Sequence, residues 1–148
     1  MKLFKVAKAY LRQAMARLKD AEEALQECNY PYAVRLSQEC VELSLKAILK
    51  AVGIEYPKIH DVSDVMLEVK DRFPIWFKVE IDFLRESSKI LVKKREISLY
   101  GGEEAFLAPE EVINEMDAKD AVKRAKKTYY LCEKLINEVE QKENELLL

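Results

Sequence analysis

The sequence is poor in residues that break regular structure and in residues that most often bind metals. Only three glycines and four prolines occur in 148 residues, which argues against an all-β protein with many turns and against a disordered chain. A single histidine, His60, excludes a zinc helix of the H-E-x-x-H kind and the paired Glu-x-x-His motifs of di-iron bundles. The three cysteines form no C-x-x-C pair, so the sequence predicts no metal site, no cofactor and no disulfide framework.

Long apolar runs and an excess of one charge are absent as well. No run approaches the roughly 20 apolar residues of a membrane span, and the first residues contain no apolar core of signal-peptide length. The 25 Lys and Arg nearly balance the 27 Asp and Glu, so any contact with nucleic acid would need a local patch. These absences predict a soluble protein without membrane contact. Free thiols are typical of the reducing cytoplasm, so we expect the protein to be cytoplasmic.

Apolar residues recur at steps of three and four along most of the chain, which is typical of helices that bury one face. The first helix is expected from about Lys2 to Glu27. Pro31 suits the first turn of a second helix, which ends at about Val52 before Gly53. More than half of the circumference of this second helix is apolar, so we expect it to be the central one. The remaining elements are a short helix over 62–71, a long helix over 75–98, a polar loop over 99–108, a helical turn from Pro109, and a last helix capped by Asp117.

These elements predict an all-α fold, an up-and-down antiparallel bundle of four long helices plus one short helix. By length, residues 1–148 form a single domain that can bury a sizeable core. The tail over 143–148 is expected to be frayed. Heavy use of Lys and Glu, with only eight Asn and Gln in total, is typical of thermophilic proteins.

The stretch from Tyr30 to Met66 resembles the HEPN family of small helical domains. The family pattern is a tyrosine-alanine pair, then a helix with Gln, Glu and Lys at four-residue spacing followed by alanine, then a glycine, and then His-Asp before a hydrophobic residue. The corresponding residues are Tyr32-Ala33, Gln38, Glu42, Lys46-Ala47, Gly53 and His60-Asp61-Val62. The first and last helices are similar to the family too, so the resemblance covers nearly the whole chain.

The resemblance implies an antiparallel bundle that pairs into a homodimer. Many family members are ribonucleases, often the toxin beside a minimal nucleotidyltransferase, whereas others bind nucleotides or serve as interaction modules. Catalytic members carry an Arg-x4–6-His motif late in the chain, at the dimer cleft. Cleavage beside a 2′-OH needs a proton acceptor and a cation that stabilises the charge developing at the phosphate.

This sequence departs from the family at that motif. Arg95 stands in the arginine position, but Tyr100 stands where the histidine is expected, and no histidine follows. An ordinary tyrosine is protonated at neutral pH and is a poor general base. We therefore expect a component that binds nucleotide or RNA phosphate near Arg95 and works with a nucleotidyltransferase-type partner in a toxin–antitoxin-like system. The alternatives are an active metal-independent endoribonuclease and a non-catalytic interaction adaptor.

The candidate site residues near that motif each have two interpretations. Lys93, Lys94 and Arg95 are predicted either to bind phosphate, beside a Gly101–Gly102 loop that permits close backbone approach, or to form the solvated end of a helix. Arg95 and Tyr100 are the candidate catalytic residues. The other interpretations of Tyr100 are packing and, by resemblance to some family pairs, modification by the nucleotidyltransferase.

A second group of polar residues surrounds the central helix. The family match assigns Glu42, Lys46, His60 and Asp61 to a structural polar network. The alternatives are an ordinary i, i+4 ion pair between Glu42 and Lys46, and a role for His60 as the missing base.

Overall fold

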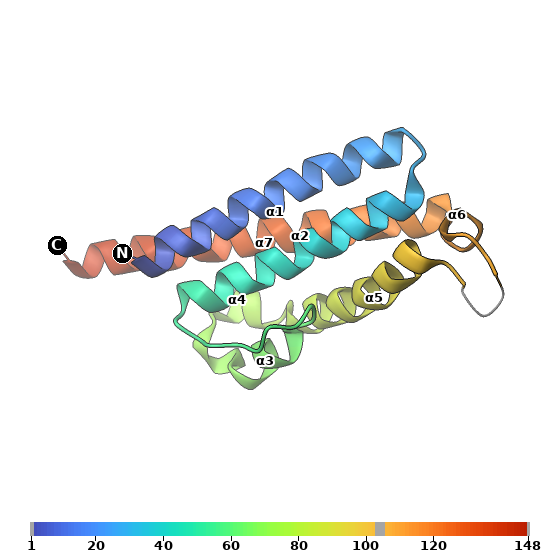
Figure 1. Ribbon diagram of the computed structural model, residues 1–148. Coiled ribbons are helices and arrows are strands. Elements are labelled where there is room, and N and C mark those ends of the chain that lie inside the picture. Colours follow the sequence, from blue (N-terminus) through green and yellow to red (C-terminus); the bar gives the residue numbers. More distant parts are fainter. Residues whose placement is uncertain (1, 103–105, 148) are drawn as a thin grey trace.

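The structure, a computed structural model, describes residues 2–102 and 106–147 and consists mainly of helices (Figure 1). The four long helices are α1 (Lys2–Gln26), α2 (Tyr30–Ala51), α5 (Ile81–Tyr100) and α7 (Glu115–Leu147). Shorter elements lie between them: α3 (Ser63–Glu68), the 3-10 turn η1 (Lys70–Arg72), α4 (Ile75–Lys78) and α6 (Pro109–Val112). Across these described ranges no β-strand forms, and the one bridge joins Gly102 to Leu107.

The long helices run alternately up and down, as Figure 1 shows. The central helix is α2, since it packs against α1, α5 and α7, whereas α1 and α7 also contact each other. The N- and C-terminal ends lie at the same end of the bundle. The predicted all-α, up-and-down antiparallel bundle is therefore confirmed, with more short helical elements than the single one expected.

Burial explains the central place of α2. Its side chains Leu45, Ile48 and Leu49 are all fully buried, and each such aliphatic side chain contributes about 2 kcal/mol on removal from water. Pro31 occupies the first turn, and Gly53 follows the helix end with a positive φ of 74°. One line of polar residues at four-residue spacing nevertheless crosses this apolar helix. We call it the α2 polar row: Gln38, Glu42, Lys46 and Lys50.

Two of the predicted helices have different limits. The helix expected over 62–71 is α-helical only in α3 and continues as the 3-10 turn η1. The helix expected over 75–98 is divided into α4 and α5 around Val79 and Glu80, and α5 then continues to Tyr100. Apolar residues keep their helical spacing across both of these breaks. The periodicity of the sequence therefore does not show where one helix ends and the next begins.

The last helix begins three residues earlier than expected. The N–H of Asp117 donates to the side-chain oxygen of Asn114 at 2.9 Å, and the N–H of Asn114 donates to the Asp117 carboxylate at 3.1 Å. This reciprocal pair is a capping box in which Asn114 is the cap and Asp117 is the third residue of the helix. The helix α7 also continues through residues 143–147, where the sequence indicated a frayed tail.

Gly101 ends α5 in a conformation that needs glycine. Its φ is +68°, and a Cβ at this position would lie 2.2 Å from the carbonyl oxygen of Leu107. The polar loop thus starts at residue 101 rather than at 99, and residues 103–105 lie outside the described part. The backbone that approaches Gly101 closely is that of the chain's own residues Leu107–Pro109.

Replacing Gly101 with alanine should therefore lower the free energy of unfolding by about 2 kcal/mol or more, since backbone strain and a steric clash add together. Urea denaturation would measure the loss. Gly102→Ala is the matched control, because the nearest atom to its Cβ would be 3.4 Å away, an ordinary contact. Equal losses in the two variants would contradict this account.

The aromatic end of the bundle joins α4 to α7. Phe77 is fully buried, and its ring centroid lies 5.0 Å from that of Phe73 and 5.7 Å from that of Trp76. The indole N–H of Trp76 donates to Glu138 at 3.0 Å, and the ammonium of Lys134 lies 4.3 Å from the indole centroid. These contacts hold the short α4 against the long α7.

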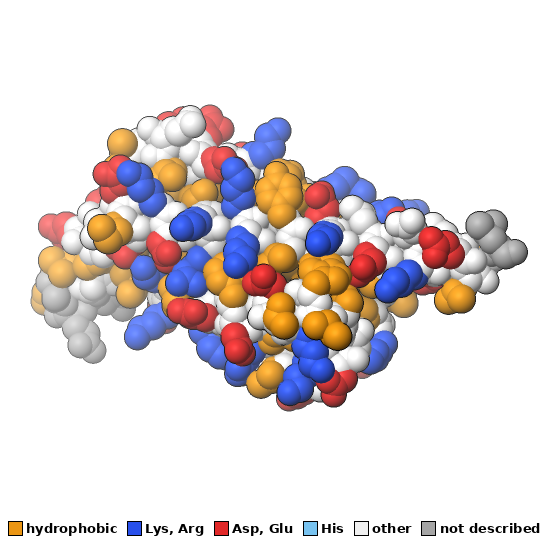
Figure 2. Space-filling model, turned by 180° about the vertical axis from the view of Figure 1, so that it is seen from behind, with side chains coloured by type: hydrophobic (Ala, Val, Ile, Leu, Met, Phe, Trp, Pro, Cys, Tyr) orange, Lys and Arg blue, Asp and Glu red, His pale blue; other side chains and the backbone are white. Residues whose placement is uncertain are grey.

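Charges of both signs are distributed over the surface. On the face shown in Figure 2, basic and acidic side chains are interspersed with hydrophobic groups between them. Ion pairs such as Lys8–Glu140 and Arg17–Glu39 connect neighbouring long helices. None of the helices within 2–102 and 106–147 has the length and apolar character needed to cross a membrane.

Candidate functional site

A connected chain of hydrogen bonds joins Arg95 on α5 to the α2 polar row. The guanidinium of Arg95 donates through Nη1 to Oε1 of Gln38 at 2.7 Å. The side-chain nitrogen of Gln38 in turn donates to Oε1 of Glu42 at 3.0 Å. Gln38 is only 1% exposed, and both the oxygen and the nitrogen of its buried side-chain amide have hydrogen-bond partners. The position of Arg95 is thus fixed from α2, its neighbour in the bundle.

The carboxylate of Glu42 is the centre of this network. Besides Gln38, it accepts hydrogen bonds from His60 Nδ1 and from Lys46 Nζ, each at 2.8 Å. Burial alone would raise the pKa of Glu42, but the hydrogen bonds from Gln38, Lys46 and His60 outweigh it and lower the pKa below 4.5. Glu42 is therefore ionised at neutral pH.

His60 and Arg95 line one pocket with Tyr100. The cavity has a volume of about 310 Å³ and is lined by His60, Val92, Arg95, Glu96, Leu99 and Tyr100. We call it the Arg95 pocket. The Glu42 carboxylate beside Nδ1 favours the His60 tautomer that carries its proton there, which leaves Nε2 as the accepting nitrogen. The pocket therefore combines a cation, an oriented imidazole and a phenol.

The predicted basic cluster does not converge on this pocket. Lys94 is turned toward α7, where its ammonium donates to Asp117 at 2.8 Å. Lys93 is exposed, and successive helical residues point about 100° apart. Of the three predicted phosphate-binding residues, only Arg95 lines the pocket.

Asp61 belongs to a separate cluster. Its carboxylate accepts from the backbone and hydroxyl of Ser63, from the hydroxyl of Ser88 at 2.6 Å and from Lys89 at 3.1 Å. It holds the start of α3 against α5 and is not bonded to Glu42. The predicted network of four residues is thus divided, with Glu42, Lys46 and His60 together and Asp61 apart. Burial would raise the pKa of Asp61, but the bonds from Ser63, Ser88 and Lys89 lower it to about 2.

Replacing Asp61 with asparagine should lower the free energy of unfolding by about 1–2 kcal/mol at neutral pH. The folded-state pKa lies below the ordinary 3.8, so this contribution is present above about pH 4 and is lost as the pH falls toward about 2. The stabilities of wild type and variant should therefore converge in acid, which urea denaturation at several pH values would measure. Asp71→Asn, at an exposed ion pair with Lys78, is the control and should leave stability almost unchanged. A wild-type–variant difference that stays constant in acid would contradict the assignment.

The arrangement defines a class of protein, a helical bundle in which Glu42 of the central helix bonds His60 of the following loop and Gln38 of the same helix bonds Arg95 of α5, so that His60 and Arg95 line one pocket. A family model for the HEPN domain matches residues 7–135. The chain therefore belongs to the HEPN domain family, and the resemblance seen in the sequence is confirmed.

Solved structures support the same assignment of the fold. One is the crystal structure of TT1696 from Thermus thermophilus, with 23% identity, a TM-score of 0.72, and coverage of 86% of this chain and 96% of that chain. Another is that of ST0689, described as an archaeal HEPN homologue, with 25% identity, a TM-score of 0.68, and coverage of 88% and 97%. No curated protein matches the chain.

The structure adds residues to the site that the sequence did not assign. Gln38, which belongs to the family pattern, is the direct partner of Arg95. Lys50 extends the α2 polar row and lines a second pocket with Tyr10 and Tyr56. The signal available in the sequence was the four-residue spacing of polar side chains on a helix that is otherwise apolar.

Proposed function

We propose that this HEPN-family protein binds the phosphate of a nucleotide or of RNA in the Arg95 pocket. The observation that carries this proposal is the hydrogen bond from Arg95 Nη1 to the buried Gln38. It holds the guanidinium in place at the pocket, and among the described residues the other N–H groups of Arg95 have no partner. A guanidinium restrained in this way loses little freedom when it binds a phosphate through two N–H groups.

The protein is proposed to act in the cytoplasm as a homodimer, with a nucleotidyltransferase-type partner in a toxin–antitoxin-like system. The family supports the dimer and the partner. Large apolar side chains that are mostly exposed in the single chain also support an interface: Met116 is 79% exposed and Phe106 95%. Light scattering after size exclusion should give twice the mass of the chain. A monomer at micromolar concentration would contradict the dimer.

The phosphate proposal is tested by calorimetry with a short single-stranded RNA. Arg95→Ala should weaken binding at least about tenfold, the effect of losing a charged hydrogen-bond donor. Arg12→Ala removes an exposed arginine on α1 and should leave the affinity unchanged. Absence of binding by the wild type, or equal affinities for wild type and Arg95→Ala, would contradict the proposal and favour the adaptor function.

A second candidate function is metal-independent RNA cleavage with His60 as the base. The 2.8 Å contact between Glu42 and His60 Nδ1 favours it, because a carboxylate partner orients an imidazole for proton transfer. His60 Nε2 would take the proton of a 2′-OH whose oxygen attacks the adjacent phosphorus, while Arg95 stabilises the added negative charge. The 5′-oxygen leaves with a proton from water, giving a 2′,3′-cyclic phosphate and a 5′-hydroxyl.

Cleavage assays with purified RNA in EDTA test this second function. His60→Gln should reduce the rate at least about 100-fold, as expected for loss of a general base, while RNA binding persists. Tyr100→Phe, which keeps the ring in the same pocket, should retain most of the cleavage. Intact RNA after incubation with the wild type, or undiminished cleavage by His60→Gln, would exclude this role.

A further inference from the structure

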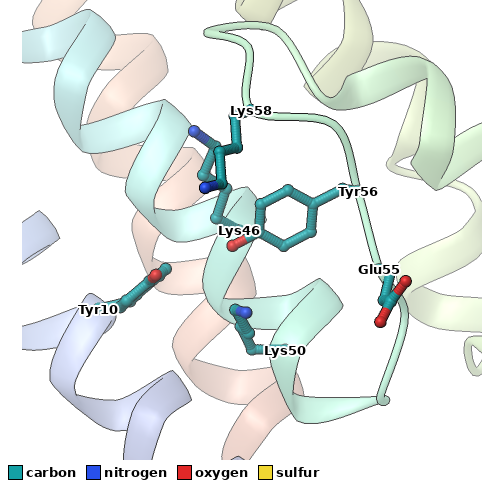
Figure 3. Close-up of a pocket in the computed structure, with 6 residues that line it drawn as sticks. All are labelled: Tyr10, Lys46, Lys50, Glu55, Tyr56 and Lys58. Atoms are coloured by element: carbon teal, nitrogen blue, oxygen red, sulfur yellow. The ribbon is translucent and has the colours of Figure 1, made fainter.

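A second pocket lies at the other end of the α2 polar row, where α1, α2 and the loop over 52–62 meet (Figure 3). The cavity has a volume of about 450 Å³. Its lining residues are basic or aromatic, with one carboxylate. We call it the lysine–tyrosine pocket, and it is lined by Tyr10, Lys46, Lys50, Glu55, Tyr56 and Lys58.

Positive charge exceeds negative charge in this pocket. Three ammonium groups face a single lining carboxylate, that of Glu55. Lys46 is paired with Glu42 at 2.8 Å, but neither Lys50 nor Lys58 has an ion-pair partner within 2–102 and 106–147. In Figure 3 Glu55 is drawn on the opposite side of the Tyr56 ring from the tyrosine hydroxyl.

The lysines are held close to one another around one aromatic ring. The Nζ atoms of Lys46 and Lys50 lie 5.8 and 5.4 Å from the centroid of Tyr56, within cation–π range. Lys46 is only 15% exposed on its side chain. Like charges gathered in a partly desolvated site repel one another, and a bound anion removes that repulsion.

Two hydroxyl groups add neutral hydrogen-bond donors. In Figure 3 the hydroxyls of Tyr10 and Tyr56 point into the same space as the lysine ammonium groups. Burial, followed by the neighbouring Tyr10 and the charge of Glu42, raises the pKa of Tyr56 above its usual 10. Tyr56 therefore keeps its proton at neutral pH and can donate it in a hydrogen bond.

We propose that the lysine–tyrosine pocket binds a compact polyphosphate anion, such as inorganic tripolyphosphate. The ammonium groups of Lys46, Lys50 and Lys58 would contact its charged oxygens, and the tyrosine hydroxyls would donate to the remaining ones. Several cations and two neutral donors around one cavity suit an anion with several charged oxygens better than a single carboxylate. This site is separate from the Arg95 pocket and does not depend on the proposed function there.

Calorimetry with inorganic tripolyphosphate, and then with ATP, tests the site. The double variant Lys50→Gln/Lys58→Gln should weaken tripolyphosphate binding at least about tenfold, since each lost charged contact costs a severalfold loss of affinity. The control Lys123→Gln/Lys126→Gln removes the same charge from exposed positions on α7 and should change the affinity less than about twofold. Arg95→Ala should retain tripolyphosphate binding, which separates this site from the Arg95 pocket.

The other outcomes are equally decisive. Absence of saturable binding by the wild type, or equal losses in the two double variants, would overturn the proposal, since equal losses indicate only general electrostatic attraction. Tyr56→Phe should weaken binding a few-fold while helicity and melting temperature stay at the wild-type values. In the Arg95→Ala background, ATP that binds more tightly than tripolyphosphate would support a nucleotide as the ligand, and equal affinities would support recognition of the polyphosphate alone.

Discussion

Replacing Glu42 with alanine should lower the free energy of unfolding by about 2–4 kcal/mol at neutral pH. Its carboxylate accepts hydrogen bonds from Gln38, His60 and Lys46. The side chains of Glu42 and Lys46 are each only 15% exposed, so the variant leaves an ammonium with little access to water and no counter-ion. The buried amide of Gln38 also loses its acceptor. Urea denaturation followed by circular dichroism would measure the loss.

An exposed ion pair of the same spacing provides the control. Lys119→Ala breaks the pair between Glu115 and Lys119, whose side chains are 56% and 64% exposed, and should change stability by less than about 0.5 kcal/mol. The double variant Glu42→Ala/Lys46→Met should recover part of the loss, because the uncompensated charge is gone. A Glu42→Ala effect as small as that of Lys119→Ala would show that the network contributes no more than a surface ion pair.

Replacing Phe77 with alanine should lower the free energy of unfolding by about 3–5 kcal/mol. The ring is completely buried and lies against Phe73 and Trp76, so its removal leaves a cavity that α4 alone is too short to close. Ile75→Ala in the same helix is the matched control, since Ile75 is 80% exposed and should contribute less than about 0.5 kcal/mol. Thermal and urea unfolding would both measure the difference. A Phe77→Ala loss under about 1 kcal/mol would contradict the tight packing of this end.

Most of the fold follows from local patterns in the sequence. The three- and four-residue spacing of apolar residues locates the four long helices, and apolar residues over more than half of the circumference of α2 identify it as the central helix. The break around Val79 and Glu80 has no local signal, because apolar residues continue at helical spacing on both sides. The cap at Asn114 was missed since Asp117, three residues later, is itself a favourable cap residue.

The site was predictable only in part, because its contacts join distant parts of the chain. Gln38 and Arg95 are 57 residues apart, and no spacing rule connects them. The spacing of the α2 polar row indicated the pair between Glu42 and Lys46. It gave no indication that the loop after α2 returns His60 to the same carboxylate. The contact between Lys94 and Asp117 was not predicted for the same reason, since Asp117 lies on another helix.

The single tryptophan gives the bundle a built-in fluorescent reporter. Trp76 is the only indole in the chain, and it is bonded to Glu138 and covered by Lys134, both on α7. Its emission is therefore expected to respond to the separation of α4 from α7. Neither the Arg95 pocket nor the lysine–tyrosine pocket includes Trp76 among its lining residues. Local opening of this end can thus be followed optically, without a label, while either pocket is filled or emptied.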